Sequence, residues 1–279
     1  MARARTDADE RWDAAGFDLL LLTVANDVQR RYAERMLGFR RRLGALPAGL
    51  ETRVVADPGG RRVGSGGSTL LCMADLASRG SLRGRRVLIL HSGGDARRLP
   101  SWSAFGKVWV PLGRHGTGLG PMNAPALFDL VLAELSTLAL PAAGGVVVAS
   151  GDAALRLTGE RIALDGRDAT VVAVPAGPAR AARHGVFVVD RRGCVRRTLQ
   201  KPTRAQLAEA GALDARGQAL VDGGIFCFPP AACAALLGGA RPMLAAIRRG
   251  TLALDGRDAT VVAFPAGPAR ATRRPSRCV

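Results

Sequence analysis

The stretch RVLILHSGGDARRLPSWSAFGK (residues 86–107) places a short apolar run directly before two adjacent glycines and a group of cations. The run from Val87 to Leu90 has no polar residue, which predicts a strand buried on both faces. Two glycines after such a strand let the backbone pass close to a ligand, and the N–H groups exposed in such a turn can bind an anion. A tight turn whose arginines are solvated fits the same spacing. The stretch therefore predicts an α/β fold and a candidate anion site.

Similar apolar runs alternate with helical patterns along most of the chain. Because these runs are apolar on both faces, they predict a mostly parallel central sheet covered by helices on both sides, a three-layer α/β sandwich. Strands are expected at 17–25, 52–58, 85–90, 107–112, 144–152, 169–176, 184–190 and 221–230. Helices are expected at 27–44, with Asn26 or Asp27 as cap, after a glycine loop within 64–78, and at 124–138 and 205–213.

The boundaries of the domain follow from where these patterns stop. We expect an N-terminal extension at 1–16, one domain at 17–249, and a poorly ordered segment at 250–279. Residues 163–181 recur at 253–271 with a single difference, Val174 against Phe264. Two copies this alike are too few for a repeat architecture, which needs about three. We interpret the second copy as a local duplication or a chimeric gene end, and we expect no strand or helix in the tail 271–279.

The charge of the chain is strongly positive, at +17. Of its 40 basic residues only two are lysines, and the arginines are spread over the whole length. No basic tail, aromatic row or zinc spacing accompanies them, so wholesale use of arginine on the surface is favoured over specific nucleic-acid binding. A smaller anion such as a nucleotide is well served by this potential.

The cysteines and the first apolar run bear on the location of the protein. The five cysteines form no C-x-x-C pair, which favours reduced thiols and a cytoplasmic protein. The apolar run that opens at Asp18 covers only eight residues. This is too short to cross a bilayer, so we expect a buried strand and no membrane association.

The two lysines both fall inside glycine or proline motifs, Gly106-Lys107 and Gln200-Lys201-Pro202. A guanidinium cannot replace an ammonium where a compact, mobile charge is required. Their retention in an arginine-rich chain supports a function for Lys107 and Lys201. The three histidines, at 91, 115 and 184, show no partner pattern and are expected to be structural.

A second glycine loop precedes the helix within 64–78. It contains the candidate nucleotide-binding residues Gly64, Gly66, Gly67, Ser68 and Thr69. Backbone N–H groups at a helix start favour an anion or a base edge. A plain glycine turn with Ser68 as the helix cap is the alternative.

Asp152 follows the apolar run 144–150, at the strand end where open α/β sheets bind ligands. An oxygen ligand at this place suits Mg²⁺, which takes one or two carboxylates and otherwise water and phosphate. The alternative is a turn aspartate that caps the next segment.

Taken in order, the segments 17–37, 54–70, 86–112, 146–152, 184–202 and 221–226 resemble the GDP-fucose pyrophosphorylase family, over roughly 17 to 235. The glycine loop at 64–69 and the stretch HSGGD-x-RRLP are together specific for it. The resemblance implies a Rossmann-like nucleotide-diphospho-sugar transferase fold of the GT-A-like kind, whose C-terminal domain is missing from this chain. It also implies transfer of GMP from GTP to a hexose 1-phosphate, most naturally L-fucose 1-phosphate, with Mg²⁺ as cofactor.

The stretch 93–107 also resembles the G-G-x-G-T-R-L…P-K signature of sugar nucleotidyltransferases, with Ala96 and Arg97 at the departing positions. The resemblance makes Arg98 and Lys107 the catalytic cations that neutralise the triphosphate. The site residues that it implies are Gly93, Gly94, Asp95 and Arg97 for the nucleotide, Lys201, Asp222 and Gly223 for the sugar phosphate, and Asp152 for the metal. Two alternatives remain: a nucleotide-binding remnant without turnover, and an arginine-rich nucleic-acid binder.

Overall fold

The computed structural model describes residues 16–80, 84–92, 100–112, 125–138, 143–153, 155–156, 169–249 and 270–272. The expected N-terminal extension and most of the duplicated segment and tail lie outside these residues. Where the tail is described, Arg270–Thr272 forms strand β9, so the expectation of no strand there is wrong for its first residues. This strand pairs in parallel with β5 (Thr170–Ala176).

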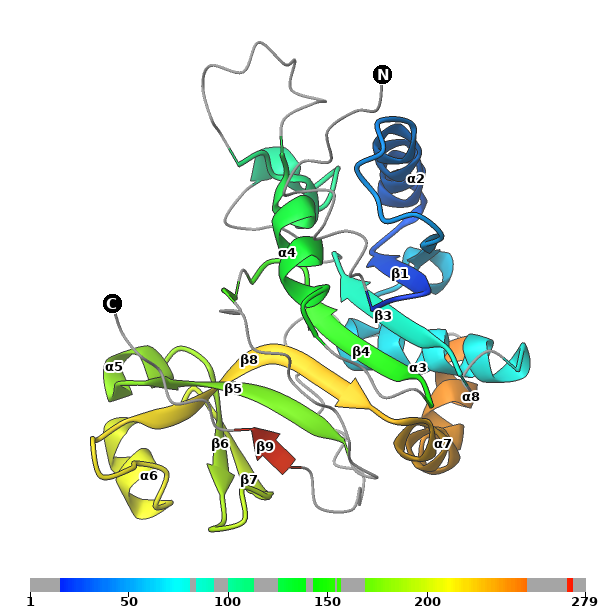
Figure 1. The fold of residues 1–279 in the computed structure, drawn as a ribbon. Coiled ribbons are helices and arrows are strands. Elements are labelled where there is room, and N and C mark those ends of the chain that lie inside the picture. The colour runs from blue at the N-terminus through cyan, green and yellow to red at the C-terminus, as the bar shows by residue number, and fades with distance from the viewer. Residues whose placement is uncertain are drawn as a thin grey trace.

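The first half of the sheet is parallel, in the order β2-β1-β3-β4 (Figure 1). Its strands are β1 (Leu19–Val24), β2 (Glu51–Ala56), β3 (Arg86–His91) and β4 (Gly145–Ser150). The apolar run of β1 places every one of its side chains in the interior, whereas β2 at the sheet edge is only partly buried. The register aligns their carboxyl ends, with Thr23 opposite His91 and His91 opposite Ser150. This half confirms the predicted parallel sheet.

The second half of the sheet is largely antiparallel, and here the prediction of a mostly parallel sheet is wrong. β8 (Ala219–Phe228) runs antiparallel to β4, β5 and β6. β6 (Gly185–Val189) and β7 (Val195–Gln200) form a hairpin. The physical reason is the short connection around Gly193, whose φ of 78° suits a tight turn that joins antiparallel neighbours.

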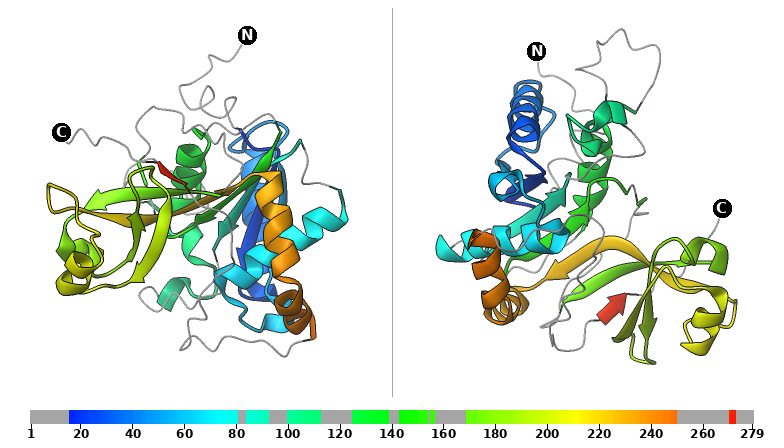
Figure 2. Two further views of the ribbon diagram at one scale, coloured as in Figure 1. Left: turned by 90° about the horizontal axis from the view of Figure 1, so that it is seen from below. Right: turned by 180° about the vertical axis from the view of Figure 1, so that it is seen from behind.

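Helices cover both faces of the parallel half (Figure 2). α2 (Asp27–Arg42) and α4 (Leu127–Leu135) pack against the side chains of Leu20, Leu88 and Val147, and α3 (Gly64–Ser78) packs against the opposite face. Asn26 caps α2 by accepting a hydrogen bond from the Gln29 N–H, as expected. The three-layer arrangement is therefore confirmed for this half.

Of the remaining helices, two lie near the antiparallel half of the sheet and two lie next to α3. α5 (Pro178–Ala181) and α6 (Arg204–Glu209) lie beside the β6–β7 hairpin, and α7 (Pro230–Gly239) and α8 (Arg241–Arg249) lie beside α3 (Figure 2). No single helix among the described residues is long and apolar enough to cross a membrane, whereas α7 and α8 together, bent by 65°, meet the criteria of length and composition.

One expected strand is absent. Residues 107–112 contain the 3₁₀ helix η3 (Lys107–Trp109) and only an isolated bridge from Pro111 to Ala126. Two further short 3₁₀ helices are η1 (Pro58–Gly60) and η2 (Pro100–Trp102). The strand fails because Gly106, at a φ of 98°, turns the chain so that the Trp109 ring stacks on Phe128 instead of continuing a ladder.

Gly144 provides a test of how β4 enters the sheet. Its φ is 82°, and a Cβ at this position would lie 2.5 Å from the backbone N and O of Arg85. We expect Gly144→Ala to lower the free energy of unfolding by about 2 kcal/mol or more, because neither backbone can yield without breaking the β3–β4 ladder.

Gly38→Ala is the matched control, since Gly38 lies inside α2 and its nearest atom would be the mobile end of Arg42 at 3.8 Å. This change is expected to raise the free energy of unfolding by up to about 1 kcal/mol. Denaturant titration of both variants measures the difference, and equal stabilities would contradict the account.

Candidate functional site

Lys107 and Asp152 meet at the carboxyl ends of the parallel strands. The Lys107 Nζ donates a hydrogen bond of 2.9 Å to the Asp152 Oδ2, and the two side chains are 29% and 48% exposed. Ser150 Oγ donates to the other carboxylate oxygen, Oδ1, at 2.6 Å. The structure thus brings together the predicted cation and the predicted metal ligand, which are 45 residues apart in the chain.

The charge state of Asp152 follows from these contacts. Partial burial raises the pKa of the carboxyl group, but the hydrogen bonds from Ser150 and Lys107 and the positive charge of Lys107 outweigh it. The net effect lowers the pKa, so Asp152 is an anion at neutral pH. A half-exposed carboxylate that is already ionised is suited to a divalent cation.

Two glycines bring the segments that carry this pair against the end of β3. Gly151 N–H donates to the His91 carbonyl at 2.8 Å, and a Cβ on Gly151 would lie 2.7 Å from that oxygen. A Cβ on Gly106 would lie 2.8 Å from Ser92 Oγ. No residue with a side chain fits either place without a shift of its surroundings.

His91 joins β3 to its neighbours beneath the pair. Its Nδ1 lies 2.7 Å from Thr23 Oγ1 and its Nε2 lies 2.9 Å from Thr69 Oγ1. Burial lowers the pKa of the imidazole to about 4, so the ring is neutral at physiological pH. These contacts support the structural role expected of His91, whereas His115 lies outside the described residues.

The second glycine segment differs from the expected loop. α3 begins at Gly64, with a φ of 69°, so the glycines form its first turn and Ser68 is not the helix cap. Ser68 Oγ instead donates to Asp57 Oδ1 at 2.7 Å. A Cβ on Gly67 would crowd the side chains of Val63 and Ile247. Packing alone therefore accounts for a glycine at this position, and no ligand is needed to explain it. Packing on α8 overrides the local preference for a loop.

Gly66 and Asp57 are the parts of this helix start that could face a ligand. A Cβ on Gly66 would meet no atom within 4 Å, so the surface is open there. Burial raises the pKa of Asp57, and the hydrogen bonds from Ser68 and the Val63 N–H only partly oppose this. Asp57 was not predicted as a site residue, because its place beside Ser68 depends on where β2 ends.

The bulge of β8 lies next to the ion pair of Lys107 and Asp152. Between Val172 and Ala173 the β5–β8 register shifts, which leaves Gly223 and Gly224 as extra residues. Gly224 N–H donates to Asp222 Oδ1 at 2.7 Å, and a Cβ on Gly224 would lie 3.3 Å from the Ser150 Cβ. The segment expected to shape a sugar pocket therefore touches the serine that binds Asp152.

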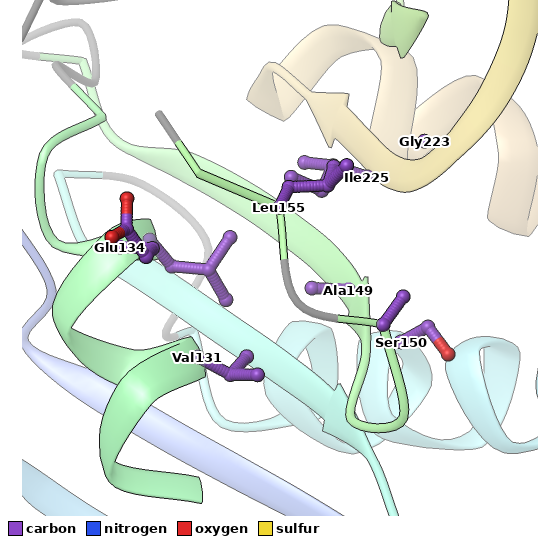
Figure 3. A pocket seen from close by; sticks show the side chains of 9 residues that line it. Val131, Glu134, Ala149, Ser150, Leu155, Gly223 and Ile225 are labelled. Carbon is purple, nitrogen blue, oxygen red and sulfur yellow. The ribbon is translucent and has the colours of Figure 1, made fainter. Parts of the chain in front are cut away.

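A shallow pocket opens at this junction, between α4 and the β8 bulge (Figure 3). It is open to solvent and has room for no more than about one water molecule. Its walls are mostly apolar and include one carboxylate, Glu134, together with Ser150 and Gly223.

Lys201 lies beyond Asp222 in an unusual backbone conformation. Its φ is 47°, and it is the one non-glycine residue with positive φ among those described. Its N–H donates to the His184 carbonyl at 3.0 Å. A Cβ on Gly185, the residue after His184, would lie 3.3 Å from the Asp222 Cβ and 3.5 Å from Gln200 Oε1.

A continuous series of contacts thus runs from Lys107 through Asp152, Ser150 and the β8 bulge to Asp222 and the Gln200–Lys201 turn. Burial raises the pKa of Asp222, and the hydrogen bond from the Gly224 N–H and the charge of His184 oppose this only in part. Ser150 was not predicted, although its place two residues before Asp152 is a usable signal.

Other predicted residues cannot be placed. Gly93, Gly94, Asp95, Arg97 and Arg98 lie outside the described residues. Within the part of the chain that the structure describes, no group of three or more His, Cys, Asp and Glu side chains could hold a metal ion. A cation at Asp152 would therefore take most of its ligands from water and phosphate.

Comparison with known proteins places this arrangement in a family. Residues 79–256 match the family model of the fucose pyrophosphorylase domain, which spans both Lys107 and Asp152. The chain therefore belongs to the fucose pyrophosphorylase domain family, and the resemblance drawn from its motifs is confirmed.

The curated relatives carry matching names. The chain is similar to a bifunctional fucokinase/GDP-fucose pyrophosphorylase of Arabidopsis thaliana, at 29% identity over 242 residues, which are 75% of this chain and 23% of that protein. It is similar to a fucose-1-phosphate guanylyltransferase of Mus musculus, at 32% identity over 185 residues, which are 63% of this chain and 30% of the relative. The chain thus spans less than a third of the length of these relatives.

His91 makes stability depend on pH. Because the folded pKa of about 4 lies below the ordinary value of 6.5, the unfolded chain takes up the proton first. The part of the free energy of unfolding that depends on a neutral His91 is intact above pH 6.5 and is lost as the pH falls toward 4. We expect a loss of about 2 kcal/mol from His91 alone between about pH 7 and about pH 5.

The measurement is urea unfolding of the protein and of His91→Gln at both pH values. Glutamine keeps a hydrogen-bonding side chain but does not titrate, so its stability should fall by about 2 kcal/mol less over this interval. An identical fall in both proteins would show that His91 is not the group responsible.

Proposed function

We propose that the chain catalyses nucleotidyl transfer from GTP to L-fucose 1-phosphate. A phosphate oxygen of the sugar phosphate attacks the α-phosphorus of GTP, the bond from that phosphorus to the bridging oxygen breaks, and pyrophosphate leaves with the electron pair. The products are GDP-fucose and pyrophosphate, and no covalent intermediate with the protein is needed. Family membership supports the substrates, and the Lys107–Asp152 contact carries the assignment to a site.

The cations near the strand ends would supply the electrostatic part of catalysis. Lys107 is held at the carboxyl edge of the sheet, where negative charge grows on the leaving pyrophosphate, and Arg98 would join it from the adjoining segment. Preorganised charges of this kind stabilise a transition state because they need no reorientation when the charge develops. The backbone N–H groups of 93–95 and the start of α3 would bind the nucleotide.

Mg²⁺ fits the residues present. Asp152 offers an ionised and half-exposed carboxylate, and Asp222, whose pKa is raised by burial, offers a second carboxyl group across Ser150 and Gly224. When bound, Mg²⁺ would neutralise phosphate charge. Asp152 would hold it, Ser150 would orient that carboxylate, and Lys107 would then be free to turn toward a phosphate.

The sugar phosphate would lie along the β8 bulge. Asp222 and Gly223 would border the sugar, and Lys201 would bind its phosphate. The strained backbone of Lys201 supports this role, because residues in left-handed conformations cluster where binding requires them. We also propose that the sheet is of the GT-A-like kind and that the protein works in the cytoplasm.

Lys107→Ala tests the central role. The variant should release pyrophosphate from GTP and L-fucose 1-phosphate at least about a hundredfold more slowly, because one preorganised charge is lost. Arg192→Ala, which removes an exposed cation in the β6–β7 turn, is the matched control and should keep the rate. Wild-type turnover in Lys107→Ala would refute the site.

Titration with GTP separates the two kinds of failure. A wild-type chain that binds GTP without releasing pyrophosphate would be a nucleotide-binding remnant. Retention on DNA that free GTP does not compete away, and that salt abolishes, would favour a nucleic-acid binder instead.

Lys201→Gly tests the strained turn. Glycine adopts the positive φ at less cost, so the free energy of unfolding should rise by up to about 1 kcal/mol. The lost charge should raise the KM for L-fucose 1-phosphate about tenfold or more while the KM for GTP stays unchanged. Steady-state kinetics with each substrate varied measure both, and a rise in the KM for GTP alone would place Lys201 in the nucleotide half.

A further inference from the structure

One face of α2 contacts the segment that carries Lys107 at several points. Gln29, Tyr32 and Arg40 lie on this face, at spacings of three and eight residues. Gln29 is 2% exposed, and its Nε2 donates to the Ser103 carbonyl at 2.7 Å while its Oε1 accepts from the Ala25 N–H. The Tyr32 ring lies 4.7 Å from the Phe105 ring.

Arg40 contacts the residue that follows Lys107 by two positions, Trp109. The guanidinium carbon of Arg40 lies 5.0 Å from the centre of the Trp109 ring and 5.6 Å from that of Phe128. Trp109 and Phe128 stack on each other at 4.8 Å. Arg40 therefore packs against the ring that ends the 3₁₀ turn of Lys107.

An ion pair anchors this guanidinium. Arg40 Nε and Nη2 donate to the two carboxylate oxygens of Asp129 at 2.7 and 2.8 Å, and Arg40 is only 3% exposed. Asp129 also accepts from the Ala126 N–H at the start of α4. The Leu127 N–H donates to the Val110 carbonyl, so α4 holds the chain just after Trp109.

Stability alone does not explain a buried pair of this kind. The cost of removing two charges from water often exceeds their attraction, and apolar replacements can be as stable. Arg40 Nη1 and Trp109 Nε1 are also buried without hydrogen-bond partners in the described part of the chain. A bidentate pair does, however, fix the plane of the guanidinium, and with it the ring on which it packs.

We propose that Arg40 is a positioning residue that holds η3 through Trp109, so that Lys107 stays in contact with Asp152. The consequence for turnover rests on the function proposed above, whereas the effect on the Lys107–Asp152 contact does not. Arg40 itself touches neither Lys107 nor Asp152 in any described contact.

The scarcity of lysine allows a direct test. Because the sequence has only two lysines, acetylation by an N-hydroxysuccinimide ester can be followed at each of them by peptide mass spectrometry. Lys201 serves as the internal reference, since it lies on the far side of the β8 bulge. The amine of Lys107 is ion-paired and partly covered, which slows its acetylation.

The test variant is Arg40→Met combined with Asp129→Asn. It removes both buried charges together, and the asparagine oxygen can still accept from the Ala126 N–H. Acetylation of Lys107 should become about twofold to fivefold faster, the range that the loss of a partly exposed ion pair implies, while that of Lys201 is unchanged. Arg41→Met is the matched control, because Arg41 binds the Leu50 carbonyl and Thr52 instead.

Unchanged acetylation of Lys107 in the folded double variant would overturn the proposal, as would an equal increase at both lysines. Arg40→Lys, which keeps the charge balance but loses the planar fork, is the second variant and should give a smaller increase. In an active chain, the double variant should lower kcat about tenfold without raising the KM for L-fucose 1-phosphate. A chain without turnover would refute the proposed function, while the acetylation rates would still decide the role of Arg40.

Discussion

Backbone crowding at the carboxyl end of β3 determines the rest of the site. Gly106 and Gly151 approach Ser92 and the His91 carbonyl more closely than any side chain would allow. Each is followed directly by one member of the ion pair, so the same close approach sets the separation of Lys107 from Asp152. The charges are therefore placed by packing of the main chain, which is more rigid than a contact between long side chains.

The parallel half of the fold could be predicted from the sequence because its physical cause is local. Runs such as residues 19–22 are apolar at every position, and only burial on both faces satisfies them. The antiparallel half could not be predicted in the same way. Its strands have similar composition, and the choice of neighbour depends on the turn at Gly193 and on the bulge in β8. The η3 turn likewise depends on Phe128, which is distant in sequence.

The candidate site was predictable to the extent that glycine and lysine patterns mark it. The motifs indicated Lys107 and Asp152 separately, and the structure shows that they touch. Of the two predictions for Ser68, the alternative of a helix cap is wrong, because its bond to Asp57 is set by tertiary packing, and the nucleotide-binding role stays a prediction. Arg40 could not be found from sequence, since one arginine among many shows its role only through the rings around it.

The ten residues of β8 pair with β4 at 225–228, with β6 at 220–221, and with β5 on both sides of the bulge. The same strand therefore borders the Asp152 corner and carries Asp222. Because β5 pairs with β8 on both sides of the bulge, both ends of the site belong to one sheet (Figure 1). The spacing between the Asp152 corner and Asp222 is thus set within one sheet, by β8 and its bulge, and a change in the bulge would alter the length of substrate that reaches both ends.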